Sequence, residues 1–170
     1  MDEHISEELR IKLHELARVQ EAQPGDLDDE HERWALYLVA IREGLGIAQL
    51  FDVLPLEPDL AMASSAVVNL VERSAPEERR VWLSRIPQEA RDHPEKRVAE
   101  LETVDAVLRG ELRADHVAGD LDSWSDWLQL RITGRVEDPA VLRILAERGR
   151  TKRIRRQAEE ALTGDESHEI

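Results

Sequence analysis

Few residues in this chain have the type and spacing that metal binding or catalysis requires. His31 follows Asp28 by three positions and directly precedes Glu32, a set that could hold a metal ion on one face of a helix. Because no second histidine lies nearby, we interpret these three side chains as solvated residues at a helix start. His14 and His116 lack the partners of an HExxH or HxE zinc motif. We therefore expect no metal site and no cofactor.

Other catalytic signatures are also incomplete. Residues 44–46, Gly-Leu-Gly, lack the third glycine and the preceding strand of a dinucleotide-binding loop. Residues 120–127 fail as a calcium loop because Trp124 and Ser125 stand where an oxygen ligand and a glycine are needed. No serine lies in a GxSxG elbow, and the absence of cysteine excludes thiolate chemistry and disulfides. The sequence therefore favours a non-enzymatic protein; a small metal-assisted hydrolase is the alternative that bound metal would reveal.

The charges of this chain are divided unevenly along its length. Its formal net charge is -14 at pH 7, and residues 1–32 hold eleven acids against three bases. Residues 131–156 reverse this balance, with nine bases against three acids. Such a distribution disfavours nonspecific attraction of the whole chain to nucleic acid or membranes but leaves one local basic surface.

Basic residues concentrate at the start of the last expected helix. They are Arg150, Lys152, Arg153, Arg155 and Arg156. Cations at this end oppose the helix dipole, which costs each of them about 0.3 to 1 kcal/mol at low salt. A local rule broken in this way indicates a contact site, either for an acidic protein surface or for phosphate. The alternative is internal: Arg155 bonds within the fold and the other cations contact acidic neighbours.

Two tryptophans stand shortly before the basic segment. We expect Ser123 to cap a helix that places Trp124 and Trp127 on one face, with Arg131 one turn further. Such a pair of tryptophans is typical of a core. Since tryptophan and arginine are also enriched at binding hot spots, we include Trp124, Trp127 and Arg131 with the basic residues in one candidate partner-binding site.

Apolar spacing predicts helices along nearly the whole chain, and no run alternates as a half-buried strand would. We expect eight or nine helices joined by short loops, an all-α fold of antiparallel hairpins. Six helices are expected near 7–23, 34–41, 47–54, 59–72, 76–86 and 94–108, followed by the helix after Ser123 and two more at 139–148 and 151–162.

The last two expected helices carry the most specific pattern in the chain. Asp138 and Pro139 are an expected N-cap and first helical residue, followed by an apolar stripe. Thr151 can cap the second helix, whose residues 154–162 (IRRQAEEAL) are similar to the V-R-x-A-A-x-x-A-L segment common in HEAT repeats. The specific resemblance is limited to residues 138–162. It implies HEAT-like helical hairpins stacked into a short solenoid, with an irregular helical bundle as the alternative.

Length and composition favour one domain over residues 1–164, followed by a flexible acidic tail over 165–170. No apolar stretch approaches the about 20 residues that cross a bilayer, and the acidic start holds no signal-peptide core. We therefore expect a cytoplasmic protein without membrane contact. The leading hypothesis is a protein-protein interaction module of adaptor, regulatory or immunity type. Nucleic-acid or phosphate binding through the basic helix is the alternative, and a second copy could cap an apolar end of the stack as a homodimer.

Overall fold

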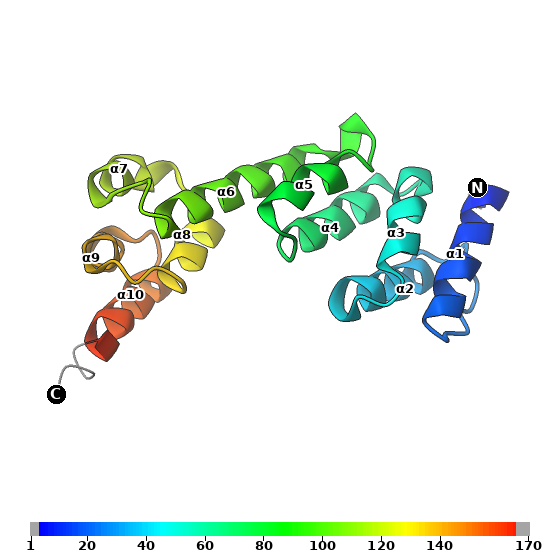
Figure 1. Cartoon of the computed structure of the whole chain (residues 1–170), viewed down its shortest axis with the longest axis horizontal. Helices are drawn as coiled ribbons and strands as arrows, with labels where there is room; N and C mark the ends of the chain where they lie inside the picture. The colour runs from blue at the N-terminus through cyan, green and yellow to red at the C-terminus, as the bar shows by residue number, and fades with distance from the viewer. Residues whose placement is uncertain (1–3, 166–170) are drawn as a thin grey trace. The chain divides into compact units, whose positions relative to one another are not determined.

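The computed structural model describes residues 4–165, and all regular structure in this range is helical (Figure 1). The predicted all-α class is confirmed for these residues, which form ten α-helices and three short 3-10 helices. In chain order they are α1 (Glu7–Val19), α2 (Glu30–Glu43), α3 (Ile47–Val53), η1 (Leu54–Leu56), α4 (Leu60–Val71), α5 (Pro76–Leu83), η2 (Gln88–Ala90), α6 (Asp92–Leu108), α7 (Ala114–Asp120), η3 (Leu121–Ser123), α8 (Asp126–Thr133), α9 (Pro139–Arg148) and α10 (Lys152–Asp165). None of them combines the length and the apolar character of a membrane-spanning helix.

Side-chain caps set several helix starts where the sequence predicts them. Ser6 accepts a hydrogen bond from the amide three residues later and opens α1. Asp138 caps α9, with Pro139 as its first residue, and Thr151 Oγ1 accepts a hydrogen bond from the amide at position 154 to open α10. The two helices of the most specific sequence pattern therefore begin as predicted.

The predicted cap at Ser123 is wrong. Ser123 ends η3, and Ser125 caps α8 by accepting a hydrogen bond from the amide of Leu128 at 3.1 Å. Trp124 consequently precedes the helix in extended conformation and does not share a helical face with Trp127. Both serines fit an N-cap by type, and only the packing of Trp124 into the core decides between them.

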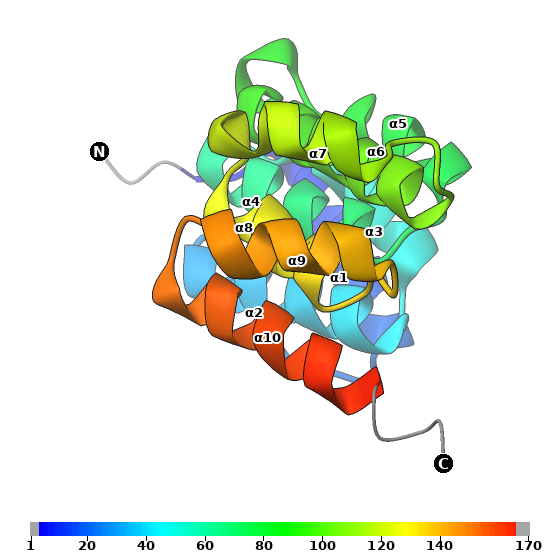
Figure 2. The ribbon, with the colours of Figure 1, turned by 90° about the vertical axis from the view of Figure 1, so that its left-hand side faces the viewer.

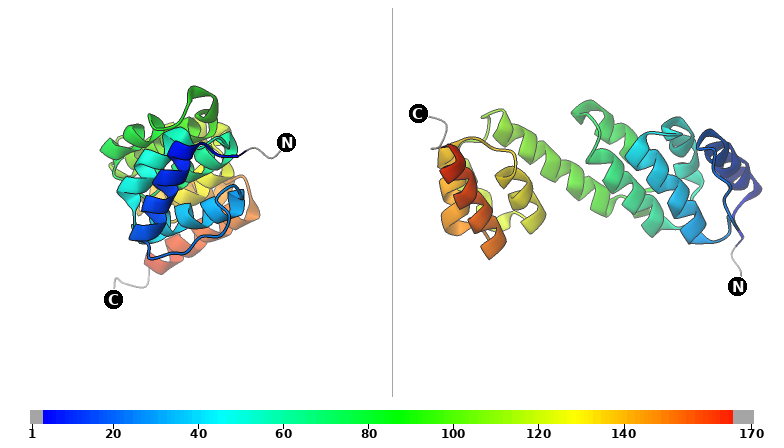
Figure 3. Two further views of the ribbon diagram at one scale, coloured as in Figure 1. Left: turned by 90° about the vertical axis from the view of Figure 1, so that its right-hand side faces the viewer. Right: turned by 90° about the horizontal axis from the view of Figure 1, so that it is seen from below.

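The chain divides into two compact units, Met1–Val98 (unit 1) and Ala99–Ile170 (unit 2), and α6 runs across the division. In unit 1, α1 packs on α2 and α3, α2 packs on α4, and α4 packs on α5 and η2 (Figure 3). Leu9, Leu13 and Leu16 of α1 are fully buried at the spacing of one helix face.

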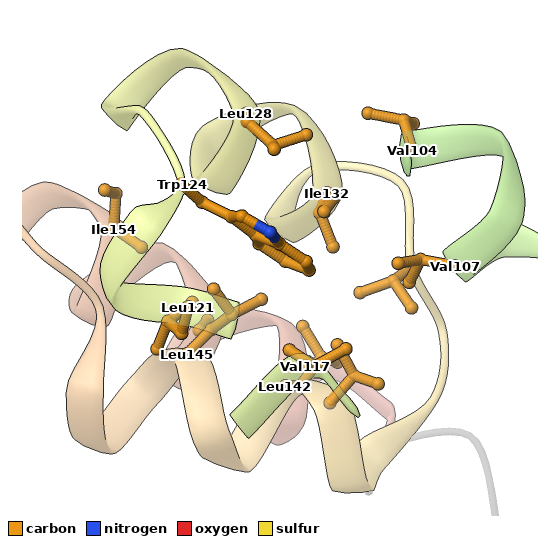
Figure 4. Close-up of a cluster of buried hydrophobic side chains, with 13 residues drawn as sticks. Val104, Val107, Val117, Leu121, Trp124, Leu128, Ile132, Leu142, Leu145 and Ile154 are labelled. Carbon is orange, nitrogen blue, oxygen red and sulfur yellow. The ribbon is translucent and has the colours of Figure 1, made fainter. Parts of the chain in front are cut away.

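In unit 2, α7, α9 and α10 follow one another as layers, and α8 packs on both α9 and α10 (Figure 2). The ring of Trp124 lies in the middle of the core cluster, among apolar side chains from α6 to α9 (Figure 4). This cluster also receives Ile154 and Ala158, four residues apart on α10. The helix of the basic segment therefore uses one face for the core and leaves the opposite face to its charges.

The turn between α9 and α10 depends on Gly149. A Cβ at this position would lie 2.5 Å from the Leu145 carbonyl oxygen and 2.6 Å from Ile154 Cγ2. Real side chains do not approach so closely, so only glycine allows α10 to fold back along α9.

The chain divides into two compact units, and this division does not decide whether residues 1–164 form one domain. The single domain therefore stays a prediction. The proposed acidic tail falls, beyond residue 165, outside the described residues.

Candidate functional site

A buried charged network joins α2 to the start of α4. Glu57, which is 4% exposed, accepts two hydrogen bonds from the Arg33 guanidinium at 3.1 and 3.2 Å. It also accepts one from the Tyr37 hydroxyl at 2.5 Å and one from the backbone N–H of Asp59 at 3.0 Å. Burial and, secondarily, the Glu57 charge raise the pKa of Tyr37 well above its usual range. Four donors therefore converge on one carboxylate and fix α2 against the segment that opens α4.

Arg33 extends this network to the loop before α2. Its remaining guanidinium nitrogen donates to the carbonyl oxygens of Leu27 and Asp28, both at 3.0 Å. A buried ion pair contributes little net stability after desolvation, but its directional bonds fix geometry. The network is therefore a positioning device for the surface above it.

Directly beside this network, a shallow hollow of about 280 Å³ lies between the first turns of α2 and α4. Half-buried Trp34 and buried Met62 supply apolar lining, and Glu30 and Asp59 supply carboxylates. Trp34 packs edge to face on Tyr37, with ring centroids 6.5 Å apart. Exposed His31 also lines the hollow, but no lysine or arginine does, so we call it the anionic hollow.

The sequence alternative of a metal site at His31 finds no support in the geometry. Asp28 bonds the N-terminal segment instead: it accepts hydrogen bonds from the Ile5 amide at 3.0 Å and from Arg10 at 2.8 Å, and it contacts His4 at 2.9 Å. These bonds, that of His4 first, hold the pKa of Asp28 well below its usual range. Within residues 4–165, no three His, Asp or Glu side chains gather as metal ligands.

Glu32 is likewise engaged by its own chain, because its carboxylate accepts a hydrogen bond from the Gly25 amide at 2.8 Å. His31 contacts Asp29, the N-cap of α2. The acidic residues around the start of α2 thus form hydrogen bonds within the chain that hold this segment in place. Its charges look like a binding cluster in the sequence because their partners lie in the backbone and in α1.

The arginines flanking the α9–α10 turn are clamped onto the segment that precedes α8. Arg148 donates to the Ala118 carbonyl at 2.9 Å and lies 3.4 Å from Asp122. Arg150 lies 3.6 Å from Asp126 and donates to the Asp122 carbonyl at 3.3 Å. Arg150, one of the predicted partner-binding residues, is thus engaged in internal bonds, and its contact with a partner stays a prediction.

Gln129 provides the buried centre of the same clamp. Its amide nitrogen donates to the carbonyls of Leu121 and Trp124 at 3.1 and 3.3 Å, and its amide oxygen accepts from the Arg150 N–H at 2.9 Å. The side chain is 1% exposed. It joins η3, α8 and the α9–α10 turn through bonds that water cannot replace.

Arg155 is also used internally, since it donates to the Gly149 carbonyl within its own hairpin. Arg156 is exposed and pairs with Glu160 at 3.4 Å, one helical turn away. Lys152 and Arg153 are exposed and form no ion pair with any residue of the described range. We call Lys152, Arg153 and Arg156 the basic surface.

The two tryptophans of the predicted site have different environments. Trp124 is 7% exposed in the core, so the expectation that it contacts a partner is corrected: its ring is already covered by the fold. Trp127 is half-buried, and the Arg131 guanidinium lies 5.8 Å from the centre of its ring. Of the predicted aromatic contact, Trp127 and Arg131 therefore keep partly exposed surface.

A second hollow, of about 370 Å³, lies where α2 and α4 end, beside α3 and α5. Phe51 and Trp82 meet edge to face at 5.3 Å, and the Arg85 guanidinium lies 4.1 Å from the Phe51 ring centre. Ile47 and Val81 line the same hollow and are 36% and 49% exposed. Exposed apolar side chains around fixed aromatic rings suit contact with another protein.

Sequence reasoning missed both hollows because each combines residues from helices distant in the chain. Trp34 belongs to a run that predicts a buried helix, and its partial exposure depends on where α4 packs. One signal was available: Glu57 is the single acid in the apolar run from Val53 to Pro58, where a carboxylate needs a buried partner. The sequence does not name that partner.

Comparison with known proteins adds no relative: no protein-family model, curated protein or solved structure matches this chain.

Proposed function

We propose that this chain is a non-enzymatic, HEAT-like helical protein that binds another protein through the basic surface at the start of α10. The α9–α10 hairpin supports the HEAT-like part, since both of its caps and its buried stripe lie where the resemblance places them. Stacking of the remaining helices as a short solenoid belongs to the same proposal.

One observation carries the choice of surface. Six cations lie between residues 148 and 156, and Arg148, Arg150 and Arg155 are held by internal bonds. Lys152 and Arg153 form no ion pair with an acidic residue of the described range. Both also lie at the start of α10, where a positive charge interacts unfavourably with the helix dipole. An acidic partner surface would compensate both their charge and the dipole.

The clamp beneath the basic surface favours binding without rearrangement. Gln129 and Arg150 fix the turn from which α10 begins. A surface held in place loses less conformational entropy when a partner docks. Trp127 with Arg131 adds an amphipathic contact in the same unit, of the kind that hot spots use.

The test is affinity capture from native lysate with the full chain, comparing wild type with the variant K152E/R153E. Glutamate in the first turn of a helix interacts favourably with the dipole, so this variant is expected to fold at least as well as wild type. A matched control, R42E/K96E, reverses two exposed cations of unit 1.

The proposal predicts that wild type recovers a partner protein after nuclease treatment and that the R42E/K96E control recovers it equally well. K152E/R153E should weaken the affinity for this partner at least about tenfold, equivalent to about 1.4 kcal/mol. Equal recovery by all three proteins would refute the assignment of the surface. Recovery that requires intact nucleic acid and falls steeply with salt would instead establish the phosphate-binding alternative.

A further inference from the structure

The anionic hollow between α2 and α4 has the composition of a site for a cationic side chain. Its walls are Trp34 and Met62, which offer apolar and aromatic surface, and its carboxylates are Glu30 and Asp59. Glu30 is exposed and forms no ion pair with any residue of the described range. Asp59 uses Oδ1 to cap α4 and keeps Oδ2 for another donor.

The hollow is held in shape by the buried network. Asp59 is fixed through its backbone N–H to Glu57, and Trp34 packs on Tyr37, whose hydroxyl bonds the same carboxylate. Trp34 and Asp59 are therefore both tied to Glu57, which is 4% exposed. A site that is already in its binding geometry loses little entropy on occupation.

Size and charge identify the occupant. A volume of about 280 Å³ is at the lower end of ligand pockets, which suits one long side chain better than a cofactor. The lining carries the carboxylates of Glu30 and Asp59, which face the positive ends of α2 and α4, together with exposed His31 and no lysine or arginine. The chain has a net charge of -14, so its long-range field favours a cation. The planar guanidinium stacks on tryptophan and can bond a carboxylate with two N–H groups, whereas lysine offers only a point charge.

We propose that the anionic hollow binds an arginine side chain presented by an exposed basic segment of a partner protein. The arginine lies against Trp34, its aliphatic part contacts Met62, and its guanidinium bonds Glu30 and Asp59. This site lies in unit 1, whereas the basic surface of the proposed function lies in unit 2, so either can fail without the other.

The test uses the full chain labelled with 5-fluorotryptophan, which reports on all four tryptophans at once by fluorine NMR. The Trp34 signal is assigned as the one that W34F removes. The probe is the peptide acetyl-Gly-Arg-Gly-amide, and the matched peptides replace arginine by citrulline, which keeps the shape without the charge, or by norleucine, which keeps only an apolar chain.

We expect the arginine peptide to shift the Trp34 signal saturably in the millimolar range while the other three signals stay in place. The citrulline peptide should bind at least about tenfold more weakly, and E30Q should weaken the arginine peptide about three- to tenfold. E89Q is the control, because Glu89 is an exposed acid of unit 1 outside the hollow.

Three results would overturn the inference. An unmoved Trp34 signal excludes binding in the hollow, and equal affinity for the arginine and citrulline peptides excludes recognition by charge. A Trp34 shift that grows with protein concentration without peptide, and that K152E/R153E removes, would make a second copy of this chain the occupant in place of a different protein.

Discussion

Removing the charge of Glu57 should strongly destabilise unit 1, because four donors depend on this one buried carboxylate. In E57Q, the amide keeps the shape of the carboxylate but faces four donors: two from Arg33, the Tyr37 hydroxyl and the Asp59 N–H. Its NH₂ group must point at one pair of them, and the buried Arg33 loses its counter-charge. Breaking a buried ion pair on one side costs about 3 to 5 kcal/mol.

The hydroxyl of Tyr37 gives a second, smaller perturbation of the same carboxylate. Y37F removes one hydrogen bond to a charged acceptor, which is worth about 1.5 to 3 kcal/mol. In the E57Q background the same change removes at most a neutral bond, worth about 0.5 to 1.5 kcal/mol. The double-mutant cycle should therefore show a coupling on the order of 1 kcal/mol.

Hydrogen exchange of the α2 amides measures these losses within unit 1, and urea unfolding followed by circular dichroism measures the whole chain. E89Q is the control and should leave both unchanged. Losses below about 1 kcal/mol for E57Q, or equal effects of Y37F in both backgrounds, would refute the network as the element that fixes α2 against α4.

Three further changes test other parts of the fold. G149A should cost about 1 to 3 kcal/mol in unit 2 by urea unfolding because its Cβ overlaps the Leu145 carbonyl, whereas G119A, with open space around its Cβ, should stabilise α7 by about 0.5 to 1 kcal/mol. Asp28 has a lowered pKa, so its bonds contribute stability above the unfolded pKa of about 3.9, and this stability is lost as pH falls. The free energy of unfolding should therefore fall less steeply with decreasing pH in D28N than in wild type, and an unchanged slope would contradict this. Q129L should cost about 2 to 4 kcal/mol, because it leaves two carbonyls and one N–H without their buried partner, and a loss no larger than that of an exposed Gln88→Leu control would contradict the clamp.

Local sequence signals predicted the α9–α10 hairpin well because each of them acts over a few residues. Asp138 and Thr151 bond amides two and three positions away, so their type and position suffice to mark a helix start. Ser123 failed for the opposite reason. Its neighbour Ser125 offers the same hydroxyl, and the burial of Trp124 in a core built from five α-helices selects between them.

The candidate site was only partly predictable. The sequence identifies a basic segment. It does not distinguish Arg150 and Arg155 from Lys152 and Arg153, because all four are basic residues of the same short segment. The internal use of Arg150 and Arg155 depends on carbonyls and carboxylates brought near by the turn at Gly149, so it could not be predicted before that turn was placed.

The sequence by itself determined the all-α class, most of the helix starts and the uneven division of charge, because helical periodicity, capping and net charge are properties of neighbouring residues. Only the tertiary structure decided which charged side chains form bonds within the fold and which are exposed to solvent. Glu57 and Arg33 are 24 positions apart, and the anionic hollow joins α2 to α4, so both depend on long-range packing. Glutamate and arginine are the same residue types in the sequence whether their side chains face water or each other. Only their burial in the folded chain distinguishes a structural ion pair from a binding site.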